Sequence, residues 1–210
     1  MKQIAILCVL LVLAGCTKSA VPDWETLPDP EPYYSTEGDV DFITEILRQR
    51  NGDATSTNNT LVIEEEIKGI SQISEKYREK GEKDLFRDAK RNGKKAVEAL
   101  AACLAKNRKK ETIKDFGILP FDYIVLTKEE KQRYFYSDPE NGWKRFYEAY
   151  PKSSGILSFS RPGFSKDGTV AVIDLGHTSG PLGGKWGAYI YEKKDGKWRC
   201  QRTIGNLLVS

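Results

Sequence analysis

Helical periodicity marks the first part of the chain after residue 41. Apolar residues recur there at intervals of three and four positions, which places them on one face of a helix. Asn92 and Gly93 interrupt the pattern, and Asn107 follows it as a residue suited to a helix C-terminus. The chain therefore predicts three amphipathic helices, the last two forming an antiparallel pair, in the stretches 42–47, 67–89 and 97–104.

Two short strands and two further helices are predicted between and after these helices. The segments 61–65 and 121–126 are rich in β-branched and aromatic residues, as strands are. Thr127, with Glu130 three positions later, forms the capping box of a helix, and Pro139 suits the first turn of the next one. That second helix carries aromatic residues at helical spacing, which are expected to be core: Trp143, Phe146, Tyr147 and Tyr150.

After Pro151 the spacing of apolar residues changes from the helical period of about 3.6 to the strand period of 2. Asp167-Gly168 and Asp195-Gly196 are turn sequences, and the second is typical of a tight hairpin. Because short loops join successive strands, these strands pair antiparallel; they cover 156–160, 169–175, 186–192 and 198–204. The sequence thus predicts an α+β fold in which N-terminal helices pack on one face of a C-terminal antiparallel β-meander of about four strands.

The N-terminus has the features of a secretion signal. Lys2 precedes an apolar run, residues 4–13, that is too short to cross a bilayer as a helix. The following Leu13-Ala14-Gly15-Cys16 resembles the lipobox of bacterial lipoproteins, in which the cysteine is acylated and the signal is removed. The alternative is an ordinary signal peptide followed by a chance cysteine. We expect residues 1–15 to be removed and a lipid on Cys16 to hold the mature chain at a membrane.

The residues after Cys16 indicate where the domain is held. A threonine at position 17, in place of an aspartate, resembles outer-membrane lipoproteins of enterobacteria, so we expect the bacterial cell envelope and its outer rather than its inner membrane. Residues 16–41 contain four of the nine prolines, and residues 17–41 carry seven acidic residues against one lysine, a net charge of −6. Such a segment favours a semi-extended tether, and a single domain then covers 42–210.

Composition and charge narrow the class of protein. The chain has 210 residues, a formal net charge of +3 and a mean hydropathy of −0.53, which excludes a multi-span membrane protein. Residues 76–114 hold fourteen basic against six acidic residues, a net charge of +8. This stretch is either a solvated helix face or a site for lipid phosphates, an acidic glycan or an envelope protein, whereas nucleic acid is not expected as a partner of an exported chain. The candidate polyanion-binding residues are Lys94, Lys95, Lys106, Arg108, Lys109 and Lys110.

Two cysteines, Cys103 and Cys200, remain after processing and lipidation. In an oxidising envelope they form a disulfide or stay as two reduced thiols, and the sequence leaves both states open. With a single histidine in the chain, a zinc site is not expected, and we expect neither a metal nor a cofactor.

The glycine-rich segment 176–185 holds that histidine and raises the question of catalysis. It lacks the spacing of a phosphate-binding loop and that of a nucleophile elbow. The sequence therefore favours a non-enzymatic binding or accessory module. The alternative is a small hydrolase with a site near Arg161, Asp174, His177 and Ser179.

Several short motifs carry a family resemblance. The run Tyr150-Pro151-Lys152-Ser153-Ser154-Gly155-Ile156, the run from Ser160 to Phe164 and the later Gly196-Lys197-Trp198 resemble a family of uncharacterised lipoproteins and secreted proteins of Bacteroidetes-type bacteria. The resemblance extends more weakly upstream, through Lys106, Asn107 and Phe116 to the segment 121–130. It implies export and a lipid anchor, but it implies no activity and no catalytic residue.

Overall fold

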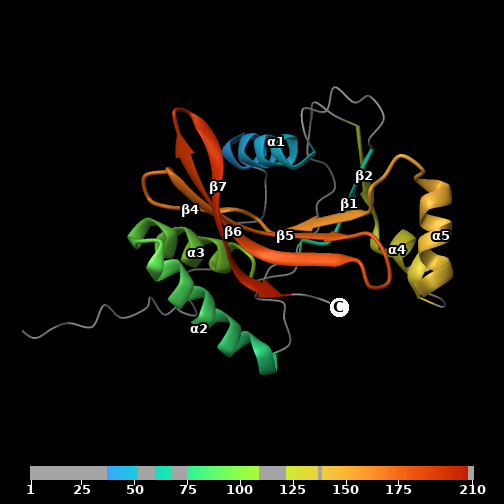
Figure 1. The fold of residues 1–210 in the computed structure, drawn as a ribbon, viewed down its shortest axis with the longest axis horizontal. Helices are drawn as coiled ribbons and strands as arrows, with labels where there is room; N and C mark the ends of the chain where they lie inside the picture. Colours follow the sequence, from blue (N-terminus) through green and yellow to red (C-terminus); the bar gives the residue numbers. More distant parts are fainter. Residues whose placement is uncertain (1–36, 52–59, 68–74, 109–121, 137–138, 208–210) are drawn as a thin grey trace, which may run out of the picture.

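One mixed β-sheet organises the protein, and five helices pack around it (Figure 1). The computed structural model describes residues 37–51, 60–67, 75–108, 122–136 and 139–207. Within these ranges the helices are α1 (Glu37–Asn51), α2 (Glu75–Arg91), α3 (Lys94–Lys106), α4 (Lys128–Phe135) and α5 (Pro139–Ala149). The strands are β1 (Leu61–Glu64), β2 (Tyr123–Leu126), β3 (Ile156–Phe159), β4 (Gly163–Phe164), β5 (Val170–Thr178), β6 (Gly184–Lys194) and β7 (Lys197–Leu207).

The sheet confirms the α+β class but is larger than the predicted meander. Its strand order is β2-β1-β3-β5-β6-β7, with the short β4 paired to β5 beside this path. The strands β3, β5, β6 and β7 pair antiparallel in succession, whereas β1 lies parallel to both β2 and β3. The sheet is therefore mixed and has seven strands, because two segments far upstream in the sequence extend it.

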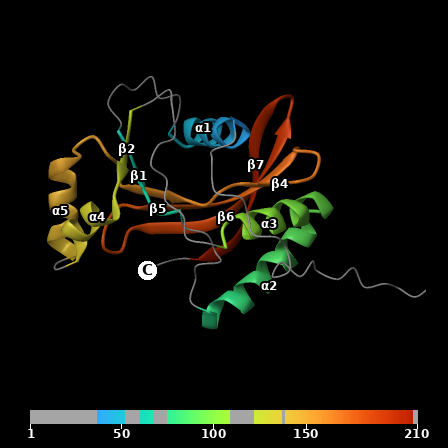
Figure 2. The ribbon, with the colours of Figure 1, turned by 180° about the vertical axis from the view of Figure 1, so that it is seen from behind.

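Helices cover both faces of the sheet, where one covered face is predicted. In Figure 1 and in the reverse view of Figure 2, α1 lies on one face and α2 and α3 lie on the other, with α4 and α5 at the far end. The reason is β5, whose residues from Val170 to Gly176 are all buried. Because successive side chains of a strand point to opposite faces, Val172 packs under α2 and α3 while Ile173 packs against α1.

The folded body begins earlier than the boundary at residue 41 that the sequence predicts. Helix α1 starts at Glu37, and the carboxylate of Asp39 is only 1% exposed. The Lys106 ammonium lies 3.5 Å from this carboxylate and donates to the carbonyl of Pro162 at 3.0 Å. Acidic composition alone suggests a tether up to residue 41, but Asp39 is buried beside the Lys106 ammonium and belongs to the folded helix α1.

Three local predictions are confirmed. Asp195 and Gly196 both have positive φ, 51° and 76°, which is the backbone of a two-residue hairpin turn and explains the glycine. At the start of α4 the Thr127 hydroxyl accepts from the amide of Glu130, and the Glu130 carboxylate accepts from the amide of Thr127. The aromatic stripe of α5 is also core at its centre, where Phe146 is fully buried.

Asn107, predicted only as a helix end, is the hub of a buried polar cluster. Its side-chain amide donates to the carbonyls of Cys103 at 2.7 Å and Arg161 at 2.9 Å, and its oxygen accepts the amide N–H of Arg161 at 2.8 Å. One side chain thus closes α3 and joins it to the chain between β3 and β4.

We expect the substitution Asn107→Ala to lower the free energy of unfolding by about 2 to 4 kcal/mol, because it removes three buried side-chain hydrogen bonds, two of them to the backbone of Arg161. The matched control is Asn92→Ala, since the Asn92 side chain donates to a carbonyl four residues earlier in an exposed position. The control is expected to change the free energy by less than about 1 kcal/mol. Urea unfolding of the two variants measures the difference, and equal losses would contradict the role given to Asn107.

Candidate functional site

The four residues of the hydrolase alternative do not converge. Asp174 and His177 lie three positions apart on β5, so their side chains point to opposite faces of the sheet. The His177 ring nitrogen Nε2 lies 3.1 Å from the carbonyl oxygen of Ser154, and the Ser179 hydroxyl faces the carbonyl of Gly183 at 3.5 Å. The side chains of His177 and Ser179 are therefore turned to different backbone groups.

Arg161 and Asp174 belong to the buried polar cluster around Asn107. Arg161 is 8% exposed and Asp174 is 2% exposed. The Asn107 side chain donates to the carbonyl of Arg161 and accepts from its amide N–H. The Ser160 hydroxyl accepts from the amide of Asp174 at 2.9 Å. A hydrolytic site needs its groups in reach of a substrate, so this geometry gives no support to the hydrolase alternative.

The glycine at position 176 has a packing reason. A Cβ atom there would lie 2.4 Å from the ring of Trp186 on the neighbouring strand and 2.6 Å from the Ser158 hydroxyl. The first glycine of the segment 176–185 thus admits an indole ring against the sheet.

The two cysteines are free, and the disulfide left open by the sequence is not present. Cys103 lies on α3 in the core beneath the sheet, whereas Cys200 is exposed on β7 and pairs in register with Tyr191, which packs on the α1 face. Sulfur atoms on opposite faces of a sheet cannot approach bonding distance without a rearrangement of the backbone.

Neither thiol is activated as a nucleophile. Burial raises the pKa of Cys103 to about 12, and the nearby charge of Asp174 acts in the same direction. The pKa of Cys200 is also raised, chiefly by its partial burial. Since the thiolate is the reactive form, both cysteines are less reactive than an ordinary thiol at neutral pH.

The candidate basic residues are divided between the two ends of α3. Lys94 and Lys95 begin this helix of 13 residues, while Lys106 and Arg108 lie at its end, about 18 Å away. Lys109 and Lys110 lie outside the described residues. Lys106 is engaged internally with Asp39 and Pro162 and also lies 5.4 Å above the Phe164 ring. The four described residues therefore do not form one surface patch.

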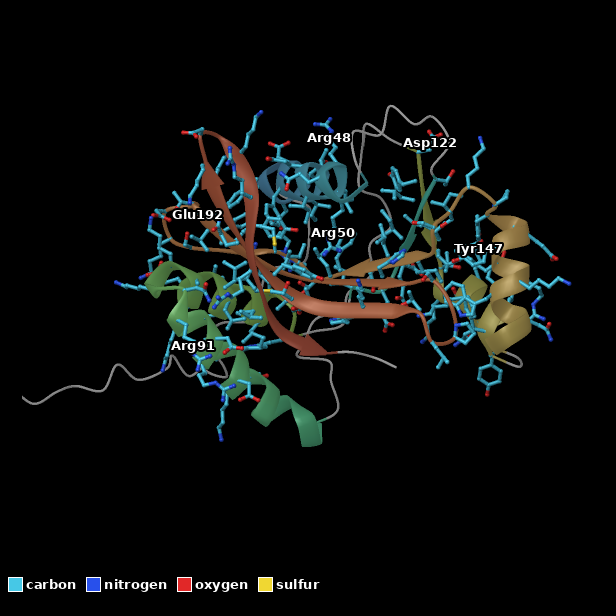
Figure 3. The ribbon with its side chains drawn as sticks, in the orientation of Figure 1. Arg48, Arg50, Arg91, Asp122, Tyr147 and Glu192 are labelled. Carbon is cyan, nitrogen blue, oxygen red and sulfur yellow. The ribbon has the colours of Figure 1, made fainter. Side chains whose placement is uncertain are left out.

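The junction of α2 and α3 holds a cavity that the pair Lys94 and Lys95 borders. Its volume is about 390 Å³, and Val170 and Ile190 form an apolar floor. Figure 3 places Arg91, at the end of α2, and Glu192 of the cavity wall at this end of the molecule. We call this space, lined also by Asn92, Gly93 and Gln201, the junction cavity.

The electrostatics of the junction cavity are positive on the side of the helix. Gly93 caps α3 without a side-chain hydrogen bond, and the first turn contains no acidic residue, so the positive end of the helix dipole is not offset there. The Lys94 side chain is 90% exposed, and Glu98 lies 4.0 Å from its ammonium. The Lys95 ammonium is paired more closely, 2.7 Å from the Asp167 carboxylate. This contact raises the pKa of Lys95 and holds the pKa of Asp167 well below its ordinary value.

The sequence pattern does not reveal the whole lining of the junction cavity. It identifies Lys94 and Lys95 as candidates, but Glu192 and Gln201 come from β6 and β7. The sequence identifies the hairpin turn between β6 and β7. It does not show the irregular register of these two strands, which decides which of their side chains face α3.

Two features are absent from the described residues, a cluster of metal ligands and a membrane-spanning helix. Among them, no group of three or more His, Cys, Asp or Glu side chains lies together as a metal site. No helix within the same ranges is long and apolar enough to cross a membrane. Cys16, the expected lipidation residue, lies outside these ranges.

Comparison with protein families, with characterised proteins and with solved structures finds no match to this chain. The resemblance to the lipoprotein family of Bacteroidetes-type bacteria thus stays a prediction that rests on the motifs themselves.

Labelling of the two thiols tests directly which of them is buried. In a chain that starts at Thr17 and is kept native at pH 8, we expect a maleimide to label Cys200 and to leave Cys103 unlabelled, because Cys103 is 2% exposed. Denaturation without a reductant should make both thiols reactive. Mass spectrometry counts the labels, and a denatured chain that takes up none would contradict the free state of the two cysteines.

Proposed function

We propose that the mature chain is a lipid-anchored protein of the bacterial cell envelope that binds an anionic envelope component and is not an enzyme. The observation that carries the binding role is the junction cavity, where two lysines and the positive end of a helix border an open space. The lipobox-like Leu13-Ala14-Gly15-Cys16 supports the anchor. Thr17 supports the outer membrane as its place.

An anionic partner fits the charges at the cavity. The ion pairs near it, such as the one between Lys95 and Asp167, are exposed and add little stability, so a ligand with several negative groups can compete for the lysines. Lys94 is the most accessible of these charges. An acidic glycan of the envelope has repeated carboxylate or sulfate groups and fits this arrangement better than a single small anion does.

The chain between the anchor and α1 suits a spacer. Residues 17–36 carry four acidic residues and one lysine, a net charge of −3. Anionic headgroups repel this segment, and its prolines oppose compaction. The domain is thereby held away from the lipid surface, with its junction cavity free for a partner.

The anchor is tested by metabolic labelling with palmitate in a bacterial host. We expect label in the full chain and none in Cys16→Ala, because the thiol that receives the lipid is gone. The control is Cys8→Ala, which changes a cysteine of the removed signal and should keep the label. Label that persists in Cys16→Ala would contradict the anchor. Separation of inner from outer membranes on a sucrose gradient then tests the place assigned by Thr17.

The junction cavity is tested by a charge reversal at its rim. We expect Lys94→Glu to weaken binding of the mature domain to heparin, used as a model polyanion, by about fivefold at low salt, which is a typical effect of exposed charges. Lys152→Glu is the control, since Lys152 is an exposed lysine between α5 and β3 and the change in net charge is identical. Equal weakening by both substitutions would show a general charge effect and contradict the site. Lys106 is unsuitable for this test because it holds Asp39.

A further inference from the structure

The chain contains three Asn-Gly pairs, a sequence in which the asparagine side chain is open to attack by the next backbone nitrogen. Two of the pairs lie within the described residues. Asn92-Gly93 connects α2 to α3 and lies in the wall of the junction cavity, whereas Asn141-Gly142 lies inside α5 (Figure 1). The third pair, Asn51-Gly52, extends beyond the described ranges. The same dipeptide thus occurs in two settings whose surroundings can be compared.

Deamidation of an Asn-Gly pair needs no enzyme. The backbone nitrogen of the glycine bonds to the side-chain carbonyl carbon of the asparagine, and the side-chain nitrogen leaves as ammonia with the proton of the attacking N–H. Water then opens the cyclic imide at one of its two carbonyl carbons, which gives aspartate or isoaspartate. Glycine permits the attack because it has no side chain beside the nitrogen. Either product carries a negative charge at neutral pH, which asparagine lacks.

The connection at Asn92 leaves room for this reaction. Gly93 has a positive φ of 95°, and a Cβ atom there would meet no heavy atom beyond its chain neighbours within 4 Å. Asn92 is exposed, and its side-chain amide donates to the carbonyl of Asp88 at 2.8 Å on the surface. The N–H of Gly93 donates to the carbonyl of Lys90 at 3.2 Å, at the long end of the usual range. Both bonds belong to the end of α2, where helices fray, so a small local opening releases both reacting groups.

The charges around Asn92 favour the reaction. The attacking nitrogen reacts after it loses its proton, and negative charge then develops on the side-chain oxygen of Asn92. Gly93 caps α3 without a side-chain hydrogen bond, and the first turn holds no acidic residue, so the positive end of this helix lies beside that charge. Lys94 follows directly and lines the same cavity, while Asp88, one turn earlier, is paired with Arg91 at 3.4 Å. Positive groups next to a developing oxyanion stabilise it.

The backbone at Asn141-Gly142 opposes the same reaction. Both residues lie within α5, where side chains tilt toward the helix N-terminus and hence away from the next backbone nitrogen. Gly142 is buried, and a Cβ atom there would lie 2.4 Å from the carbonyl oxygen of Tyr134, so α5 packs closely on α4 at this point. Formation of the imide requires part of α5 to separate from α4, which is a larger opening than the fraying of one helix end. Asn141 is therefore an internal control for Asn92.

We propose that Asn92-Gly93 is a site of spontaneous deamidation whose product lowers the affinity of the junction cavity for anions. The modification itself does not depend on the proposed function, whereas its consequence rests on the anion-binding role of the cavity. The product places a carboxylate in the cavity wall beside Lys94, where it opposes the positive end of α3. An older molecule then binds an anionic ligand less tightly than a newly made one does.

The modification is measured by mass spectrometry of peptides from a chain that starts at Thr17 and is kept native at pH 8. Digestion with pepsin at low pH avoids deamidation during the digestion itself. We expect deamidation to be about tenfold faster at Asn92 than at Asn141, because Asn141 reacts only after part of α5 opens. Asn92→Gln should abolish the mass change in its peptide, since the longer side chain closes the ring much more slowly. Equal rates at the two asparagines, or no reaction at Asn92, would overturn the proposal.

The consequence for binding is measured with heparin as the anionic probe. We expect Asn92→Asp to weaken heparin binding about threefold at low salt, a typical effect of one exposed charge. Asn141→Asp is the matched control, since it changes the net charge equally at the other end of the molecule (Figure 1) and should leave binding unchanged. Equal weakening by both, or no effect of Asn92→Asp where Lys94→Glu weakens binding, would overturn the consequence. No effect of Lys94→Glu would instead overturn the anion site itself, and with it the consequence, whereas the deamidation rates are a separate result.

Discussion

The burial of β5 on both faces is the constraint from which the rest of the arrangement follows. Seven consecutive residues of this strand, Val170 to Gly176, are buried, so each face of the sheet must be covered at its centre. Helix α1 supplies one cover and the pair α2 and α3 supplies the other. The sheet is wider than these helices, and α4 and α5 cover its far end through a third core that includes Val62 and Leu126. The junction cavity lies where α2 ends and α3 begins.

The same constraint explains why residues that resemble catalytic groups are structural. Under α3 the chain between β3 and β4 must pass through the core, and its backbone groups need partners there. The Asn107 side chain binds the carbonyl and the amide N–H of Arg161, and the Ser160 hydroxyl accepts from the amide N–H of Asp174. Polar side chains are therefore gathered in a place that substrate cannot enter, whereas His177, on the other face of β5, is tied to the carbonyl of Ser154. A sequence that brings Arg, Asp, His and Ser within twenty positions cannot by itself distinguish these two surroundings.

Local features of the fold are predictable from the sequence, and long-range features are not. The turn at Asp195-Gly196 and the capping box of Thr127 depend on neighbouring residues, so the sequence identifies both. The parallel pairing of β1 with β2 and β3 leaves no turn signal, because long connections separate these strands, and the predicted meander omits them. Likewise, the faces on which Cys103 and Cys200 lie depend on which helix covers which side of β5. The candidate site shows the same division: Lys94 and Lys95 are found from charge, while Glu192 and Gln201 are found only from the structure.

Charge counted along the sequence overstates the basic surface for a related reason. Residues 76–114 have a net charge of +8, but several of their cations already have partners within the fold. Lys106 binds Asp39 from the segment assigned to the tether, and Lys95 lies against Asp167 from the turn before β5. Both acids are remote in sequence, so a count within one stretch cannot include them. Among the described residues of this stretch, Lys94 is exposed at the start of α3, where the helix dipole adds to its charge. A net charge summed over one stretch of sequence therefore does not show which of its cations face solvent.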